Sequence, residues 1–480
     1  MLNPGTIQYE MADRTRGITC GGIGAVQMLV QKLELDKAID SRLRIFKLHN
    51  PYFESDHVLN IAYNILCDGD CLEDIEKLRN DENYLDAVGA ERIPDPTTAG
   101  DFCRRFSAGQ VETLQDIIND IRLKVWAQQD PAFFKEAIID ADGTIAKTTG
   151  ECKEGMDLSY KGDWGYGPLV VSLANTGEPL YLVNRSGNST SSKDAAKYLD
   201  QAAKVCRQGG FKKIRFRGDT DFSQTAYLDT WDTEGITFVF GIAAMPNLIN
   251  IAETLPETAW KPLLRKPRYT VATEPRRKPA NVKEQIVQER GYKNIRLQSE
   301  QVAEFDYRPV KCKQAYRMVV IRKNLSVEQG EAVLFDDIRY FFYITNDRTA
   351  LREAIVRHAN DRCNQENLIA QLKNGVSAMR MPADTLVSNW AYMVMAALAW
   401  NVKAWYALLL PVSNRWKDKH ERQKQKILRM EFKTFRKYFV TLPCQIVKTG
   451  RRLVYRLLGW NDYLDVFFRA LDSFCRPLRC

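Results

Sequence analysis

Three acidic residues of the 480-residue chain stand where their carboxylates can share one site. Asp142 lies near the end of the apolar run "EAIIDADGT", Asp219 ends "KIRFRGD", and Glu366 lies within "DRCNQENLIAQLK". The first two runs have the composition of strands, and the third has helical spacing. Because acids at the ends of adjacent strands meet at one edge of a sheet, we expect these three carboxylates to converge.

Carboxylates of this kind suit the chemistry of hard divalent cations. Mg²⁺ and Mn²⁺ prefer oxygen ligands and are usually held by a few carboxylates together with substrate phosphate. Two such ions, about 3.5–4 Å apart, activate an attacking oxygen and stabilise the leaving oxygen of a phosphodiester. With only four His and no ordered Cys cluster, the chain is poorly supplied for zinc hydrolysis. The acids therefore favour phosphodiester chemistry with Mg²⁺ or Mn²⁺.

Each acid also has an ordinary structural explanation. Asp142 can be a turn residue, and Asp219 can cap a helix. Glu366 can pair with Arg362 on a solvated helix face, for only about 0.3–0.5 kcal/mol. Asp140 and Asp142 point to the same face of their strand because the side-chain period is two, so Asp140 stays an alternative ligand.

The elements that must position these residues form an α/β pattern. Residues 1–130 have mostly helical periodicity, which fits either a helix-turn-helix DNA reader or a plain helical bundle. From residue 136, three strands are followed by alternating helix and strand, which predicts a mixed sheet with flanking helices. The interval 246–345 reads as an insertion, with a helix near "MPNLINIAETL", a basic proline-broken stretch, and the strand-like "RMVVIRKN", "AVLFD" and "RYFFYITND".

Composition places the chain among ordinary globular proteins of two to four domains, with 45% hydrophobic residues. Its longest apolar run, from Trp390 to Trp400, is about half of the ~20 residues that a membrane span needs, so we expect a buried helix. The 11 cysteines are scattered and odd in number. Reduced thiols in a cytoplasm fit this pattern best.

Positive charge is concentrated at the C-terminal end. Residues 411–480 carry 17 Lys and Arg against 6 Asp and Glu, a larger surplus than the net charge of +9 of the whole chain. This tail predicts a polyanionic partner, most simply nucleic acid. We interpret "EFKTFRKYFV" and "RRLVYRLLGW" as helical, and expect neutralisation of four tail residues to weaken binding to all DNA alike: Lys424, Lys426, Arg436 and Lys437.

Three blocks of the sequence resemble a known family. "IIDADGT", "RFRGDTDF" and "RCNQENLIAQLK" are similar to the motifs of bacterial insertion-sequence transposases of the DDE type, most closely the group numbered thirteen-eighty. The resemblance spans roughly residues 20 to 450. It implies an RNase H-like core interrupted by a mostly β insertion before the glutamate.

The resemblance also implies roles for single residues. Asp142, preferred here over Asp140, Asp219 and Glu366 correspond to the catalytic, metal-binding triad. Arg362 and Lys373 correspond to DNA-binding residues that grip phosphates of the transposon end. The sequence departs from the family pattern at Ala359, where a Tyr is expected, and at Asp221, where Gly is usual.

The resemblance, with the three acids that carry it, implies a DNA transposase that cuts insertion-sequence ends and joins them to target DNA with two Mg²⁺ or Mn²⁺ ions. The resemblance implies double-stranded DNA with terminal inverted repeats as partner, a homodimer in the synaptic complex, no membrane, and a cytoplasmic, nucleoid-associated location. An RNase H-like nuclease without strand transfer and a catalytically silent DNA-binding descendant remain alternatives. The expected division is a helical DNA-binding region at 1–130, the catalytic core at 131–245 and 346–410, a β-rich insertion at 246–345, and a basic helical region at 411–480.

Overall fold

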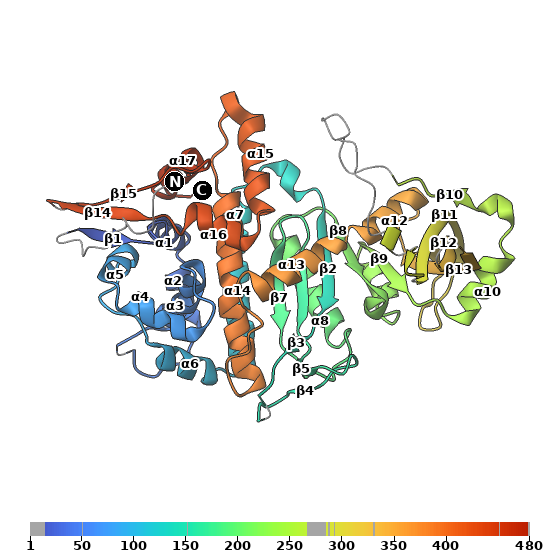
Figure 1. The fold of residues 1–480 in the computed structure, drawn as a ribbon, viewed down its shortest axis with the longest axis horizontal. Helices are drawn as coiled ribbons and strands as arrows, with labels where there is room; N and C mark the ends of the chain where they lie inside the picture. The colour runs from blue at the N-terminus through green and yellow to red at the C-terminus, as the bar shows by residue number, and fades with distance from the viewer. Residues whose placement is uncertain are drawn as a thin grey trace.

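The computed structural model of the chain describes residues 15–49, 51–150, 152–265, 285–286, 289–291, 293–329, 332–450 and 452–478. The molecule is elongated, with a helical region at one end, a sheet covered by helices in the middle, and a long-stranded arm at the other end (Figure 1). The prediction of an α/β fold built on a mixed sheet is confirmed.

A bundle of helices forms the N-terminal part, as its periodicity predicts. These helices pack around α14 (Leu386–Leu408), which contacts α3 and α7 most extensively. Because α14 is apolar on all sides it is buried almost throughout, and the prediction of a buried helix is confirmed. No helix in the described ranges is long and apolar enough to cross a membrane. The bundle consists of α1 (Ile23–Leu33), α2 (Leu35–Arg42), α3 (Glu54–Leu66), α4 (Ile75–Arg79), α5 (Glu82–Val88), α6 (Pro96–Arg104) and α7 (Ala108–Trp126).

A buried ion pair joins this bundle to the sheet. Arg122 of α7 donates to Glu178 at 3.1 Å, and both side chains are completely buried. The indoles of Trp126 and Trp405 also donate to Glu178, and Arg122 reaches Asn401 of α14. Since every partner is satisfied, this network fixes α7, α14 and the edge of the sheet relative to one another.

The central sheet has the strand order β10-β11-β12-β13-β9-β8-β2-β6-β7 among the described residues. β2, β8 and β9 are parallel, whereas β6 is antiparallel to both β2 and β7. The helix α8 (Ala195–Gln208) packs on this part of the sheet, and α9 (Leu228–Thr233) on β9. The strands are β2 (Ala137–Gly143), β6 (Leu169–Leu173), β7 (Glu178–Val183), β8 (Ile214–Gly218) and β9 (Ile236–Ile242). A small second sheet contains β3 (Ala146–Lys147), β4 (Asp157–Leu158) and β5 (Trp164–Tyr166).

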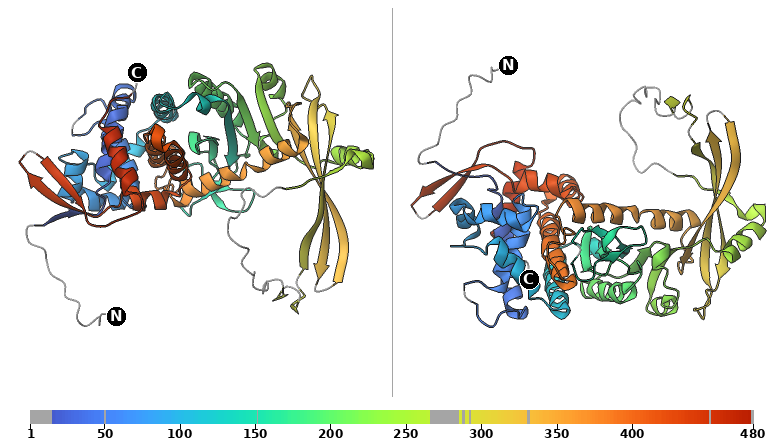
Figure 2. Two further views of the ribbon diagram at one scale, coloured as in Figure 1. Left: turned by 90° about the horizontal axis from the view of Figure 1, so that it is seen from above. Right: turned by 60° about the horizontal axis from the view of Figure 1, so that its bottom comes forward.

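Long strands extend the sheet beyond β9 as the arm seen in Figure 2. After α10 (Pro246–Thr254) and the short β10 (Lys261–Pro262), β11 (Lys293–Tyr307), β12 (Tyr316–Gln329) and β13 (Ala332–Thr345) run antiparallel. The prediction missed β11, in which the polar residues 298–301 interrupt the alternation of apolar residues, and it divided the single strand β13 into two. Most of the basic stretch before β11 lies outside the described residues. α12 (Arg352–Asn360) and α13 (Cys363–Asn374) then lead back to α14.

The C-terminal region corrects one expectation. α15 (Lys417–Leu428), α16 (Phe432–Phe439) and α17 (Leu464–Phe474) are helical, but "RRLVYRLLGW" is not. It contributes β15 (Arg452–Leu457), which pairs with β14 (Cys444–Thr449) across a turn where Gly450 has φ 54°. β1 (Arg16–Ile18) pairs with β14, so strand partners override the helical spacing.

Candidate active site

Two of the predicted acids meet at one edge of the sheet. β2 and β8 are parallel neighbours, and Asp140 lies opposite Arg217 in their register. Two residues further along, each strand reaches an acid, Asp142 at the end of β2 and Asp219 directly after β8. The convergence expected for this pair is therefore a consequence of strand direction and register.

Arg362 bridges these two carboxylates. Its Nη1 atom lies 3.3 Å from Oδ2 of Asp142 and 3.8 Å from Oδ2 of Asp219. Arg362 directly precedes α13, one turn before Glu366. It forms no ion pair with Glu366 in the part of the chain described, so the simple exposed-face pair does not occur. The side chain turns instead toward the edge of the sheet.

Both aspartates have a raised pKa. The pKa of Asp142 is raised to about 7, mainly by burial and also by the negative charges of Asp219 and Glu366, against the opposing effect of Arg362. Burial is also the main cause of the raised pKa of Asp219, which the Asp221 N–H and Arg362 oppose. One arginine therefore does not neutralise the three acids, and added positive charge is favoured here.

The donor set has the chemistry that Mg²⁺ or Mn²⁺ requires, since three carboxylates supply only oxygen ligands. Within the described ranges, no three His, Cys, Asp or Glu side chains are grouped closely enough to hold a metal ion as they stand. Glu366 is exposed on α13, and Arg362 supplies the cation between the aspartates. The three carboxylates are thus chemically suited to a divalent metal ion. The position of the Arg362 guanidinium, between Asp142 and Asp219, shows that positive charge is stabilised there.

Asp140 has a different environment from Asp142. Its two carboxylate oxygens accept hydrogen bonds from Arg217 at 2.6 and 2.7 Å, and its side chain is fully buried. Arg217 also donates to the backbone oxygen of His358, at 3.2 Å, and so connects β2 and β8 to α12. Asp140 is occupied by this pair, whereas Asp142 lies at the open end of the strand.

Neighbouring hydrogen bonds position the acids. Gln365, one residue before Glu366, bonds to the Ser172 hydroxyl and donates to the Val170 carbonyl at 3.0 Å, which anchors α13 on β6. Asp219 accepts the Asp221 N–H at 3.0 Å and thereby caps the 3₁₀ turn Thr220–Phe222. Its capping role and its place beside Asp142 are compatible.

Lys373 lies away from the carboxylates, at the other end of α13. Its Nζ atom donates to the Ile145 backbone oxygen at 2.8 Å. It lines a cavity of about 380 Å³ together with Lys147 and Arg380. Burial lowers the pKa of Lys373, and the charges of Lys161 and Lys147 lower it further. The two ends of α13 therefore serve different sites: Arg362 contacts the acids, and Lys373 lies in a separate cavity lined by other basic side chains.

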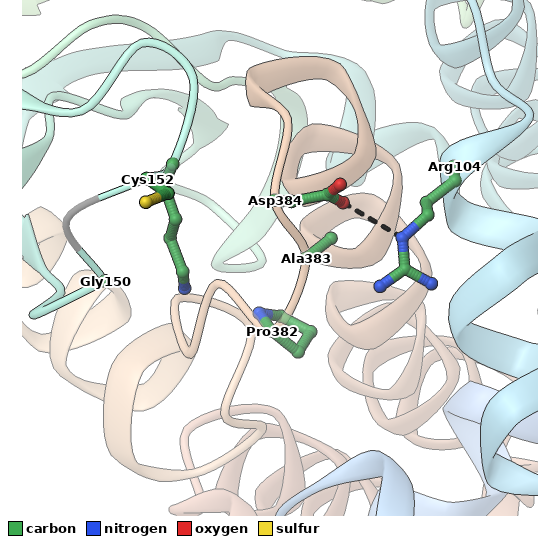
Figure 3. A pocket seen from close by; sticks show the side chains of 7 residues that line it. Arg104, Gly150, Cys152, Pro382, Ala383 and Asp384 are labelled. Carbon is green, nitrogen blue, oxygen red and sulfur yellow. Dashed lines mark hydrogen bonds and ion pairs between the residues drawn. The ribbon is translucent and has the colours of Figure 1, made fainter.

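A further cavity, of about 320 Å³, lies between α6 of the helical bundle, the loop after β3 and the segment before α14 (Figure 3). The ion pair of Arg104 on α6 with Asp384, at 2.9 Å, spans one side of it. Gly150 and Cys152 come from the loop after β3, and Pro382 and Ala383 from the segment before α14. The three predicted acids do not line this cavity.

The sequence reasoning missed two residues that support the site. Arg217 was overlooked although "KIRFRGD" places arginines inside a buried strand. A buried arginine requires an acidic partner, and this requirement was the available signal. Gln365 carried no signal, because a glutamine on a helix gives no indication of the strand to which it will bond.

Similarity to a known family extends over nearly the whole chain. The family model described as "Transposase DDE domain group 1" matches residues 18–476. No curated protein matches the chain. A solved structure described as "Cryo-EM structure of piggyBac transposase synaptic complex with hairpin DNA (SNHP)" has 10% sequence identity and a TM-score of 0.38, over 94% of this chain and 90% of that chain.

Proposed function

The chain belongs to the family described as transposase DDE domain group 1, and from this premise we propose that it cuts the ends of an insertion sequence and joins them to target DNA. The observation that carries the proposal is the meeting of Asp142 and Asp219 around Arg362, one helical turn from Glu366. These acids are separated by long stretches of sequence, and the ends of two parallel strands bring the aspartates together.

The order of the central strands supports an RNase H-like core. In β7-β6-β2-β8-β9, the strand β6 is antiparallel and the three strands β2, β8 and β9 are parallel. The long strands β11, β12 and β13 interrupt the chain between β9 and the helix with Glu366. Both features fit the fold that the sequence motifs imply for the group numbered thirteen-eighty.

In the proposed mechanism, Asp142, Asp219 and Glu366 would hold the divalent metal. Bound Mg²⁺ or Mn²⁺, as two ions, supplies activation of the attacking oxygen and stabilisation of the leaving oxygen. Water first attacks a phosphodiester at the element end, which frees a 3′-hydroxyl. That hydroxyl then attacks a phosphodiester of the target and releases a target 3′-hydroxyl. Arg362 and Lys373 would bind phosphates and orient the strands, so most of the catalytic work of the chain is positioning.

DNA with terminal inverted repeats would contact several regions. The N-terminal helices would recognise the repeats, and the basic insertion and tail would bind the backbone. Two element ends must be brought together, which implies a homodimer on DNA. Of the tail residues named above, Lys426 and Lys437 are exposed, whereas Arg436 is buried against Asp68 and Ile65, and Lys424 donates to Gln129. Lys424 and Arg436 are therefore engaged within the protein, so Lys426 and Lys437 would make the larger contribution to the predicted binding of all DNA alike.

The test is cleavage and strand transfer on labelled DNA that carries the ends of the element encoding this chain, with Mg²⁺ or Mn²⁺. Wild type is compared with Asp142→Ala, Asp219→Ala and Glu366→Ala, and with the control Glu353→Ala at the far end of α12. We expect metal-dependent nicking and joining in wild type and in the control. All three triad variants should bind the DNA and cut none of it.

Two outcomes would replace the proposal. Cutting without joining by wild type would identify a nuclease of the same fold. DNA binding without any cutting, in either Mg²⁺ or Mn²⁺, would identify a catalytically silent DNA-binding descendant. Ala359→Tyr would then be the first variant to test for recovered cutting.

A further inference from the structure

The hairpin of β14 and β15, called the ribbon here (residues 444–457), projects from the helical end of the molecule (Figures 1 and 2). β1 pairs with β14 only from Cys444 to Ile446. From Val447 to the turn, the two strands pair only with each other, and β15 forms the outer edge of its sheet. The outer half of the ribbon is thus a two-stranded element with solvent on both faces.

The charge of the ribbon has one sign. The sequence contains no Asp or Glu from residue 432 to residue 461. Lys448, Arg452 and Arg456 are exposed, and none of them forms an ion pair with any described residue. This differs from Arg436 and Lys424 of the same tail, which are used inside the protein. The ribbon therefore presents cations that the fold itself does not neutralise.

The two arginines share one face. Side chains alternate along a strand, so Arg452, Val454 and Arg456 point to one side of β15, and Leu453, Tyr455 and Leu457 to the other. The second side continues into the core through Tyr455 and Leu457. The arginine side remains open, with Val454 39% exposed between the arginines. Four residues of strand place Arg452 and Arg456 about 13 Å apart along the strand.

We propose that the arginine face of the ribbon lies across the major groove of duplex DNA, with Arg452 and Arg456 contacting phosphates on opposite walls of the groove. The major groove is about 12 Å wide, which agrees with the spacing of the two arginines along the strand. Val454, between them, faces the floor of the groove. This inference rests on the proposed function, which makes duplex DNA the ligand. It adds the ribbon as a DNA-binding element, with Arg452 and Arg456 as its contact residues.

A second copy of the chain is a less suitable occupant. The free edge of β15 can in principle pair with β15 of another molecule. A two-fold pairing centred on Val454 would place Arg452 directly opposite Arg456 of the other copy, and like charges directly opposite are destabilising. Charge complementarity therefore favours a polyanion.

The experiment measures binding of the full chain to a labelled random-sequence duplex by fluorescence anisotropy, over a range of salt and with EDTA present. The double variant Arg452→Gln/Arg456→Gln is compared with the control Lys212→Gln/Lys213→Gln, which removes two exposed charges at the amino end of β8. We expect on the order of tenfold weaker binding, and a salt dependence lower by about 1.8 in log–log slope, for the ribbon variant alone. Arg452→Lys/Arg456→Lys should restore most of the affinity, because phosphates require the charge.

Duplex affinity within twofold of wild type for the ribbon variant, or an equal loss in the control, would overturn the proposal. So would a change in oligomeric state by light scattering without a change in DNA affinity, since the ribbon would then join copies of the chain. Because EDTA prevents metal-dependent cutting, this result is independent of catalysis. A wild type that binds through the ribbon and never nicks DNA contradicts the transposase function alone.

Discussion

Two arginines of this protein each hold a carboxylate of β2, in opposite ways. Arg217 makes two short hydrogen bonds to Asp140, and neither side chain is more than 3% exposed. Arg362 makes one contact of 3.3 Å to Asp142 and one of 3.8 Å to Asp219, and is 21% exposed. The first pair is electrostatically complete, whereas the second shares one positive charge among several acids. Incomplete neutralisation marks the place where the protein can accept a further cation.

The largest expected effect is on the nicking rate, and it distinguishes Asp142 from Asp140. Asp142→Asn should lower the nicking rate by about a thousandfold, the scale seen when a group that stabilises transition-state charge is removed. Its free energy of unfolding should stay unchanged or rise, since a repulsive charge is lost. Single-turnover nicking and urea unfolding of the same preparation measure both. Wild-type nicking by Asp142→Asn would transfer the metal-ligand role to Asp140.

The next effect concerns stability at the complete pair. Arg217→Met leaves the Asp140 carboxylate buried without a partner, and should lower the free energy of unfolding by about 3–5 kcal/mol. Asp140→Leu/Arg217→Met should recover much of this loss, because both charges are then absent. Urea unfolding measures the two variants. Equal losses in the single and double variants would show that packing, not charge, dominates there.

A smaller effect is a pH dependence that only the incomplete pair produces. The pKa of Asp142 is raised to about 7 in the folded protein, so without metal the folded state binds more protons than the unfolded state between about pH 4 and pH 7. Stability should therefore fall as pH rises through this window, by up to about 1.4 kcal/mol per pH unit. Unfolding in EDTA should show a shallower fall for Asp142→Asn. Identical pH profiles would contradict the raised pKa.

The smallest effect is expected at Arg362. Arg362→Lys keeps the positive charge, and the contacts it replaces are single and partly exposed, so the free energy of unfolding should change by less than about 1 kcal/mol. Urea unfolding of Arg362→Lys and Arg217→Met under the same conditions compares the two losses of unfolding free energy. A loss as large as that of Arg217→Met would show that the Arg362 contacts stabilise the fold as strongly as the buried pair.

Local pattern was sufficient for much of the fold. The predicted strands around Asp142 and Asp219, the helix around Glu366, and the buried α14 all appear in the structure. Hydrophobic periodicity decides such elements, because it depends on near neighbours in the chain. The failures, at β11 and at β15, are strands of antiparallel hairpins, and cross-strand pairing decides their conformation although the periodicity within each strand does not reveal it.

By itself, the sequence determined which acids stand at strand ends, that a basic tail follows a nearly neutral body, and that three motif blocks resemble those of a transposase family. Only the tertiary structure decided that Arg217, 77 residues from Asp140, neutralises that acid. It also decided that Arg362, 220 residues from Asp142, turns toward that acid rather than toward Glu366. The reason is physical, because the state of a carboxylate depends on burial and on the nearest charge, and both are set by residues that are distant in the chain.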